Sequence, residues 1–141
     1  MEGRSLIYFS LKGKKYSGRV CKGWNSANIY LNVLYRIFKW RWENGVYDED
    51  IEMIADFIEE FYRVFFHESL HVLVKQLYGK YHASEKRIEF LTEKILDRFF
   101  DCIKEDNDRF FWRFWLLLVS EMFGIYKQDM EVCSVGSPHL Y

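Results

Sequence analysis

Two histidines and a glutamate stand close together in the chain, in the order His67-Glu68-Ser69-Leu70-His71, which is the pattern HExxH. Residues four positions apart lie on the same face of a helix, so the two imidazole rings can bind one Zn²⁺ ion. Glu68 follows the first histidine directly, and its carboxylate can reach a water molecule on the metal. The pattern therefore predicts a zinc site with Glu68 beside a metal-bound water.

The residues around this motif are apolar at helical spacing, which predicts a buried helix. Bulky apolar side chains occupy positions 64–66 before the motif and 72–73 after it. The plain alternative is a pair of partly exposed histidines on a surface stripe. We favour the metal site, because burying polar side chains without partners costs free energy.

HExxH is the signature of zinc metallopeptidases, which need a third protein ligand. The extended motif HExxHxxGxxH is excluded, because the chain has Val74 and Leu77 where that motif has Gly and His. A turn-like stretch at 78–83 instead leads to a second helical pattern, with Gly79 suited to end the first helix and Ser84 to begin the second. From Ser84 onward this second pattern reads SEKRIEFL. The segment 67–92 resembles the gluzincin-type metallopeptidases, particularly the small single-domain forms.

This resemblance implies that His67, His71 and Glu85 bind zinc and that Glu68 activates the attacking water for hydrolysis of peptide bonds. The expected partner is then a protein or peptide substrate. The resemblance also implies that the C-terminal tail, 127–141, can hold such an enzyme inactive, although a frayed terminus is favoured for this segment.

The third ligand has two other candidates, which are Glu89, one helical turn after Glu85, and His82, in the link between the helices. Glu85 is preferred because it falls nearer to the apolar side of the second helix. Glu89 would then accept a hydrogen bond from a ligand histidine. Donors for the developing oxyanion are sought at Tyr78, Tyr81 or His82.

Composition predicts one metallopeptidase-like domain over residues 1–141, since 141 residues that are 50% hydrophobic suffice for one core but not for two. The cysteines, at positions 21, 102 and 133, are odd in number and have no CxxC spacing. With no signal-peptide pattern, this usage favours a reducing, cytoplasmic location.

The expected fold is mainly α with a small N-terminal β-hairpin, an α+β class in which the HExxH helix packs on the Glu-bearing helix. The hairpin joins strands at 5–10 and 15–21 and belongs to a basic segment, 1–24. Helices are expected at about 25–44, 50–78, 84–104 and 108–126, with Gly45 ending the first.

Positive charge is concentrated in residues 1–41, which hold nine Lys or Arg against a single acid, Glu2. Tyr8, Tyr16 and Trp24 lie among these cations, as on a surface that binds nucleic acid. A non-catalytic regulatory or nucleic-acid-binding protein on the same scaffold is therefore the alternative function, although a solvated basic surface is favoured over nucleic-acid binding. The candidate nucleic-acid residues are Lys12, Lys14, Lys15, Arg19 and Lys22.

The most apolar stretch, 110–126, is interrupted by Arg113 and Glu121 and is shorter than the ~20 residues that a membrane-spanning helix needs. A membrane span is therefore not expected. The segment either forms a homodimer or is buried within the monomer.

Overall fold

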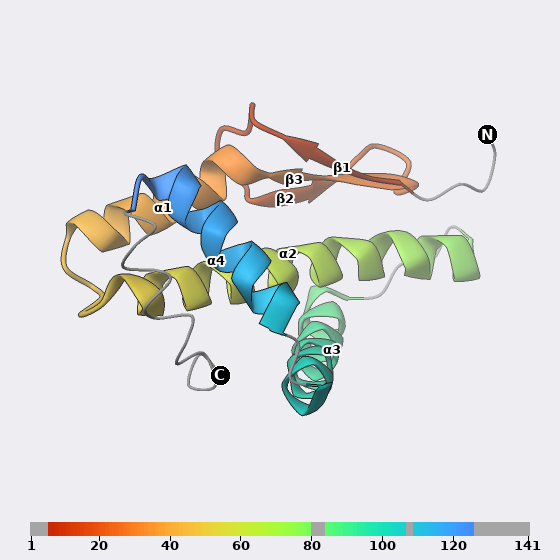
Figure 1. Cartoon of the computed structure of the whole chain (residues 1–141). Helices are drawn as coiled ribbons and strands as arrows, with labels where there is room; N and C mark the ends of the chain where they lie inside the picture. Colours follow the sequence, from red (N-terminus) through yellow and green to blue (C-terminus); the bar gives the residue numbers. More distant parts are fainter. Residues whose placement is uncertain (1–5, 80–83, 107–108, 126–141) are drawn as a thin grey trace. The chain divides into compact units, whose positions relative to one another are not determined.

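The computed structural model describes residues 6–79, 84–106 and 109–125 (Figure 1). Within these ranges three strands precede four helices, which confirms the predicted α+β class. Residue packing divides the chain into unit 1, Met1–Arg36 with Phe61–Arg98, and unit 2, Ile37–Glu60 with Phe99–Tyr141. The elements are β1 Leu6–Ser10, β2 Gly18–Val20, β3 Ser26–Tyr30, α1 Leu31–Glu43, α2 Asp50–Tyr78, α3 Glu85–Asp106 and α4 Arg109–Phe123.

The sheet of unit 1 has the strand order β1-β3-β2. β3 pairs in parallel with β1, where Leu6 faces Ser26, and antiparallel with β2, where Gly18 faces Ile29. The predicted hairpin is wrong in its pairing, because β3 lies between the two segments that it was to join. Among the described strands, β2 therefore has one hydrogen-bonding edge that no strand occupies.

The first helix, α1, begins at Leu31, whereas the sequence predicts a start at 25 or 26. Residues 26–30 instead form β3, where Ala27 and Ile29 are buried and their neighbours are partly exposed, the alternation typical of a strand. β3 passes into α1 without an intervening residue. The predicted end of this helix is confirmed by Gly45, whose φ of 72° lies in the left-handed region.

The HExxH motif lies within α2, whose two ends match their predictions. Asp50 and Glu52 occupy the first turn, where negative charge is favourable, and Asp50 Oδ1 accepts a hydrogen bond from Trp42 Nε1 at 2.8 Å. The helix ends at Tyr78, and Gly79 follows with φ 69°.

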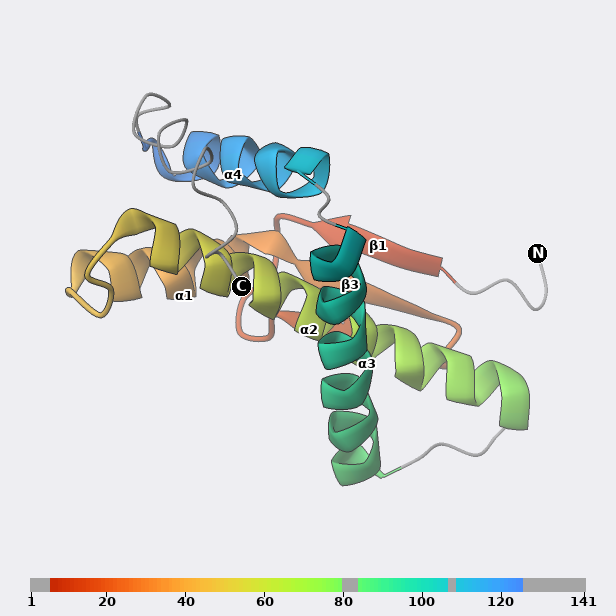
Figure 2. The same cartoon turned by 60° about the horizontal axis from the view of Figure 1, so that its bottom comes forward.

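Within unit 1, the sheet lies along the part of α2 that begins at Phe61, and α3 crosses that part of α2 (Figure 2). The ring of Phe9 in β1 stacks on that of Phe61, with the centroids 5.9 Å apart. The apolar core of unit 1 comes from β3, α1, α2 and α3, and consists of Ala27, Ile29, Val33, Leu34, Val64, Val72, Ile88 and Leu96.

Unit 2 has an aromatic core centred on Phe57, which is buried. Its ring makes edge-to-face contacts with Phe38 and Phe123 at centroid distances of 5.5 and 5.6 Å. The residues of α4 that are buried lie at helical spacing and are Trp112, Leu116, Val119, Ser120 and Phe123.

The opposite side of α4 exposes Phe110, Phe114 and Leu118, which also follow helical spacing. Self-association through 110–126 stays a prediction. No helix in the described ranges combines the length and apolar character needed to cross a bilayer.

Candidate metal centre

The two histidines of the motif point to a common position from consecutive turns of α2. Nε2 of His67 and Nε2 of His71 are 3.2 Å apart, and the rings meet edge to face. His71 is buried, with 5% of its side chain exposed, whereas His67 is 20% exposed. The helix thus places both ring nitrogens at the border between the core and solvent.

A carboxylate from α3 meets these nitrogens. Oε1 of Glu85 lies 2.6 Å from Nε2 of His67, and Oε2 of Glu85 lies 3.0 Å from Nε2 of His71. Ser84 fixes the start of α3 as predicted, because its Oγ accepts a hydrogen bond from the backbone N–H of Arg87 at 3.3 Å. This cap places Glu85 in the first turn, where its side chain remains 61% exposed.

These three residues are the group of possible metal ligands within the described part of the chain, and their ligand atoms all lie within 4.8 Å of one another. Two nitrogens bound tetrahedrally to zinc at ~2.05 Å stand about 3.3 Å apart, close to the separation of the histidine nitrogens. The carboxylate oxygens of Glu85 lie 2.6 and 3.0 Å from those nitrogens, which is closer than a third zinc ligand would lie by a few tenths of an ångström or more. Since Glu85 is largely exposed, it has room to move outward, and the donor set fits zinc.

Glu68 lies beside this group and is only 7% exposed. Its Oε2 is buried and has no hydrogen-bond partner among the described residues. Burial raises the pKa of the Glu68 carboxyl above its ordinary value, His67 acts in the opposite direction, and the carboxylate of Glu85 adds to the increase. A buried carboxylate with a raised pKa has the character of a general base.

Gly18 brings strand β2 close enough to cover Glu68. A Cβ atom at this position would stand 2.7 Å from Cγ1 of Val64 and 2.9 Å from Cγ of Glu68, both well inside van der Waals contact. Only glycine allows this approach without a shift of the strand or the helix.

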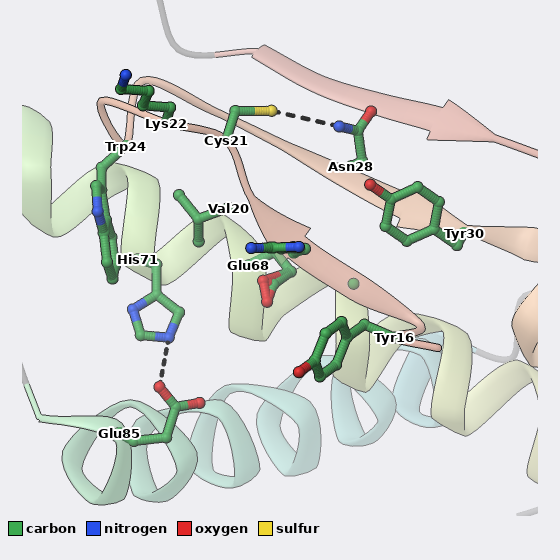
Figure 3. A pocket seen from close by; sticks show the side chains of 12 residues that line it. Tyr16, Val20, Cys21, Lys22, Trp24, Asn28, Tyr30, Glu68, His71 and Glu85 are labelled. Carbon is green, nitrogen blue, oxygen red and sulfur yellow. Dashed lines mark hydrogen bonds and ion pairs between the residues drawn. The ribbon is translucent and has the colours of Figure 1, made fainter. Parts of the chain in front are cut away.

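An open pocket of about 820 Å³ lies over the site (Figure 3). Figure 3 shows Tyr16, Glu68, His71 and Glu85 facing a common space. Glu68, His71 and Glu85 form its helix side. Its sheet side is formed by Tyr16, Gly18, Arg19, Val20, Cys21, Lys22, Trp24, Asn28 and Tyr30.

Trp24 connects the sheet side of the pocket to a histidine of the motif. Its ring contacts that of His71 edge to face, with the centroids 5.3 Å apart. The backbone of Trp24 has a φ of 62°, a left-handed conformation that costs free energy for a residue with a side chain. The turn between β2 and β3 therefore holds this ring against His71 at the expense of backbone strain.

Of the predicted ligands, His67, His71 and Glu85 are brought together, whereas Glu89 is exposed and does not belong to the group. Tyr81, His82 and the tail 127–141 lie outside the described residues. Tyr78 is exposed and is not among the residues that line the pocket.

The five candidate cations for nucleic-acid binding are all exposed. Arg19 and Lys22 line the pocket, whereas Lys12, Lys14 and Lys15 are not among its lining residues.

Sequence reasoning assigned no role in this site to Tyr16, Gly18 or Tyr30. No spacing pattern connects a short strand to a helix 50 residues later. The glycine itself was the available signal, because an isolated glycine in a strand often marks a close backbone approach.

Comparison with known proteins identifies no relative, since neither a family model, nor a curated protein, nor a solved structure matches this chain.

Proposed function

We propose that this protein is a zinc-dependent peptidase in which His67, His71 and Glu85 hold the metal and Glu68 is the general base. The observation that supports this most is the meeting of three ligand atoms from two helices beside a buried carboxylate. The helical spacing of the histidines and the cap that positions Glu85 both serve this arrangement.

A bound zinc ion would supply the positive charge that lowers the pKa of water and polarises the peptide carbonyl. Glu68 accepts a proton from the water molecule whose oxygen attacks the carbonyl carbon. It then donates that proton to the leaving nitrogen as the C–N bond breaks, so that one water yields a carboxylic acid and an amine. The burial of Glu68 favours proton uptake, because it raises the pKa of the carboxyl.

The proposed substrate site is the part of this pocket along β2. An extended peptide can add through backbone hydrogen bonds to the edge of β2 that no described strand occupies, and β2 lies directly over Glu68. Tyr16 lines the same pocket, and its hydroxyl is the proposed donor to the carbonyl oxygen as negative charge develops there.

Metal analysis of the purified chain and of single variants tests the ligand assignment. We expect one zinc per chain in the wild type and its loss in His67→Ala, His71→Ala and Glu85→Ala. Glu89→Ala is the matched control, because this exposed carboxylate lies one turn from Glu85 on α3 and outside the ligand group. Zinc that is lost from Glu89→Ala and retained by Glu85→Ala would reverse the assignment.

Glu68→Gln separates metal binding from hydrolysis. This variant should retain zinc but lose cleavage of fluorescein-labelled casein, because the amide cannot take up the proton. Undiminished cleavage by Glu68→Gln, or a wild type that binds no zinc, would refute the proposed function.

A further inference from the structure

We propose that the pocket selects acidic peptide segments, whose carboxylates are bound by Arg19 and Lys22 on its sheet side. This inference rests on the proposed function, because it assigns a substrate class to the same site. It uses residues that neither bind the metal nor move the proton.

The charged residues of the pocket are divided between its two sides. The sheet side contributes Arg19 and Lys22, and the sequence from position 3 to position 42 contains no Asp or Glu. The helix side contributes Glu68 and Glu85. A chain bound between them therefore meets only positive formal charge on the side formed by the sheet, which favours acidic side chains there.

Arg19 stands where it can recognise a side chain of a peptide added to β2. Arg19 is the exposed middle residue of β2, and it lines the pocket. On a strand added to β2, the side chain beside Arg19 projects from the same face of the sheet as Arg19 and forms a cross-strand pair with it. Opposite charges in such a pair attract, whereas like charges repel.

The carboxylates of the helix side favour a peptide over a nucleic acid. The aromatic rings do not decide between them, because Tyr16 lies under the Lys15 ammonium and the Arg19 guanidinium at 5.6 and 5.8 Å and is still 52% exposed. A peptide has a neutral backbone that can lie near Glu68 and Glu85 while its acidic side chains reach the cations, whereas a nucleic acid carries a phosphate at every step.

Three fluorescent ten-residue peptides, identical except at three alternate positions that carry Glu, Gln or Lys, test the selection. Their dissociation constants are measured on zinc-loaded Glu68→Gln protein, in which cleavage does not interfere, and kcat/KM is measured on the wild type. We expect the Glu peptide to bind on the order of tenfold more tightly than the Lys peptide at low salt, with the Gln peptide between them. Raising the ionic strength should reduce this difference, because salt screens exposed charges.

Charge reversal assigns the effect to a residue. In Arg19→Glu, made on the Glu68→Gln background, the order of the three peptides should be lost or reversed while the zinc content stays unchanged. Lys94→Glu is the matched control, since it changes the net charge equally but lies on α3 among residues that do not line the pocket. It should preserve the order of the peptides.

Three other outcomes separate failure of the acidic selection from failure of the proposed peptidase. Equal binding and equal cleavage of the three peptides would overturn the selection and leave the peptidase intact. A zinc-loaded protein that binds and cleaves none of them, or casein, would overturn both proposals. Tight, Arg19-dependent binding of a fluorescent oligothymidylate with no preference among the peptides would assign the cations to nucleic acid instead.

Discussion

Replacing Gly18 with alanine tests whether the close approach of β2 to α2 positions Glu68. The added methyl carbon would stand 2.7 Å from Cγ1 of Val64 and 2.9 Å from Cγ of Glu68. Carbon atoms in contact prefer about 3.5–4.0 Å, so the new group needs roughly 1 Å of extra space. Val64 is buried in α2 and has little freedom, so β2 or the side chain of Glu68 must give way.

Overpacking of this kind costs about 1–3 kcal/mol of the free energy of unfolding. For a chain of this length, that loss lowers the melting temperature by roughly 3–4 °C per kcal/mol. A displacement of the general base by about 1 Å can reduce turnover on the order of a hundredfold. Zinc affinity should change little, because the alanine contacts none of the three proposed ligands.

The assay combines urea denaturation, zinc content and cleavage of labelled casein for the wild type and the variant. Gly45→Ala is the control, since the left-handed φ of 72° makes a side chain costly at this position while no described residue beyond its chain neighbours lies within 4 Å of the added methyl. This control should lose stability while turnover falls much less. Wild-type stability together with wild-type turnover in Gly18→Ala would show that β2 is not packed on Glu68.

Three further substitutions test other parts of the structure. Trp24→Gly should weaken zinc binding about tenfold in chelator competition, because His71 loses its edge-to-face partner. Trp24→Phe should retain the wild-type zinc affinity. Equal zinc affinities of Trp24→Gly and Trp24→Phe would contradict this role of the ring. Phe57→Ala should cost about 3–5 kcal/mol in urea denaturation, and a loss below 1 kcal/mol would be inconsistent with a central place in unit 2. The hydrogen bond from Arg63 lowers the pKa of Glu93, and this exposed pair contributes less than about 1 kcal/mol to stability. That contribution is present above the unfolded pKa of about 4.3 and is lost as pH falls through the folded pKa. Denaturation of Arg63→Met should therefore differ from wild type at pH 7 and converge with it in acid, and a difference that grows in acid would reverse the assigned sign.

The placement of His67, His71 and Glu85 could be predicted because each step depends on local rules. Helical spacing aligned the two histidines, and the cap at Ser84 set the phase of the second helix. Glu85 meets the histidines from the first turn of α3, whereas Glu89, about 6 Å farther along the helix axis, lies outside the group. The assignment of these residues as zinc ligands stays a prediction.

The sheet could not be predicted to the same degree. Ile29 and Val33 are four residues apart, as in a helix, although the first lies in β3 and the second in α1. Because no turn residue separates the two elements, the sequence carried no signal for the change. The parallel pairing of β1 with β3 depends on contacts between distant residues, which local turn signals do not encode.

The donor atoms of the site come from two helices, and His67 and Glu85 are 18 positions apart in the sequence. An ion held by both would act as a reversible crosslink that closes a loop of that length. An ion that binds only the folded arrangement stabilises it by about 2.7 kcal/mol when its free concentration is a hundred times its dissociation constant. Folding of this protein would then respond to the concentration of free zinc, and depletion of the metal would loosen the fold as well as stop the chemistry.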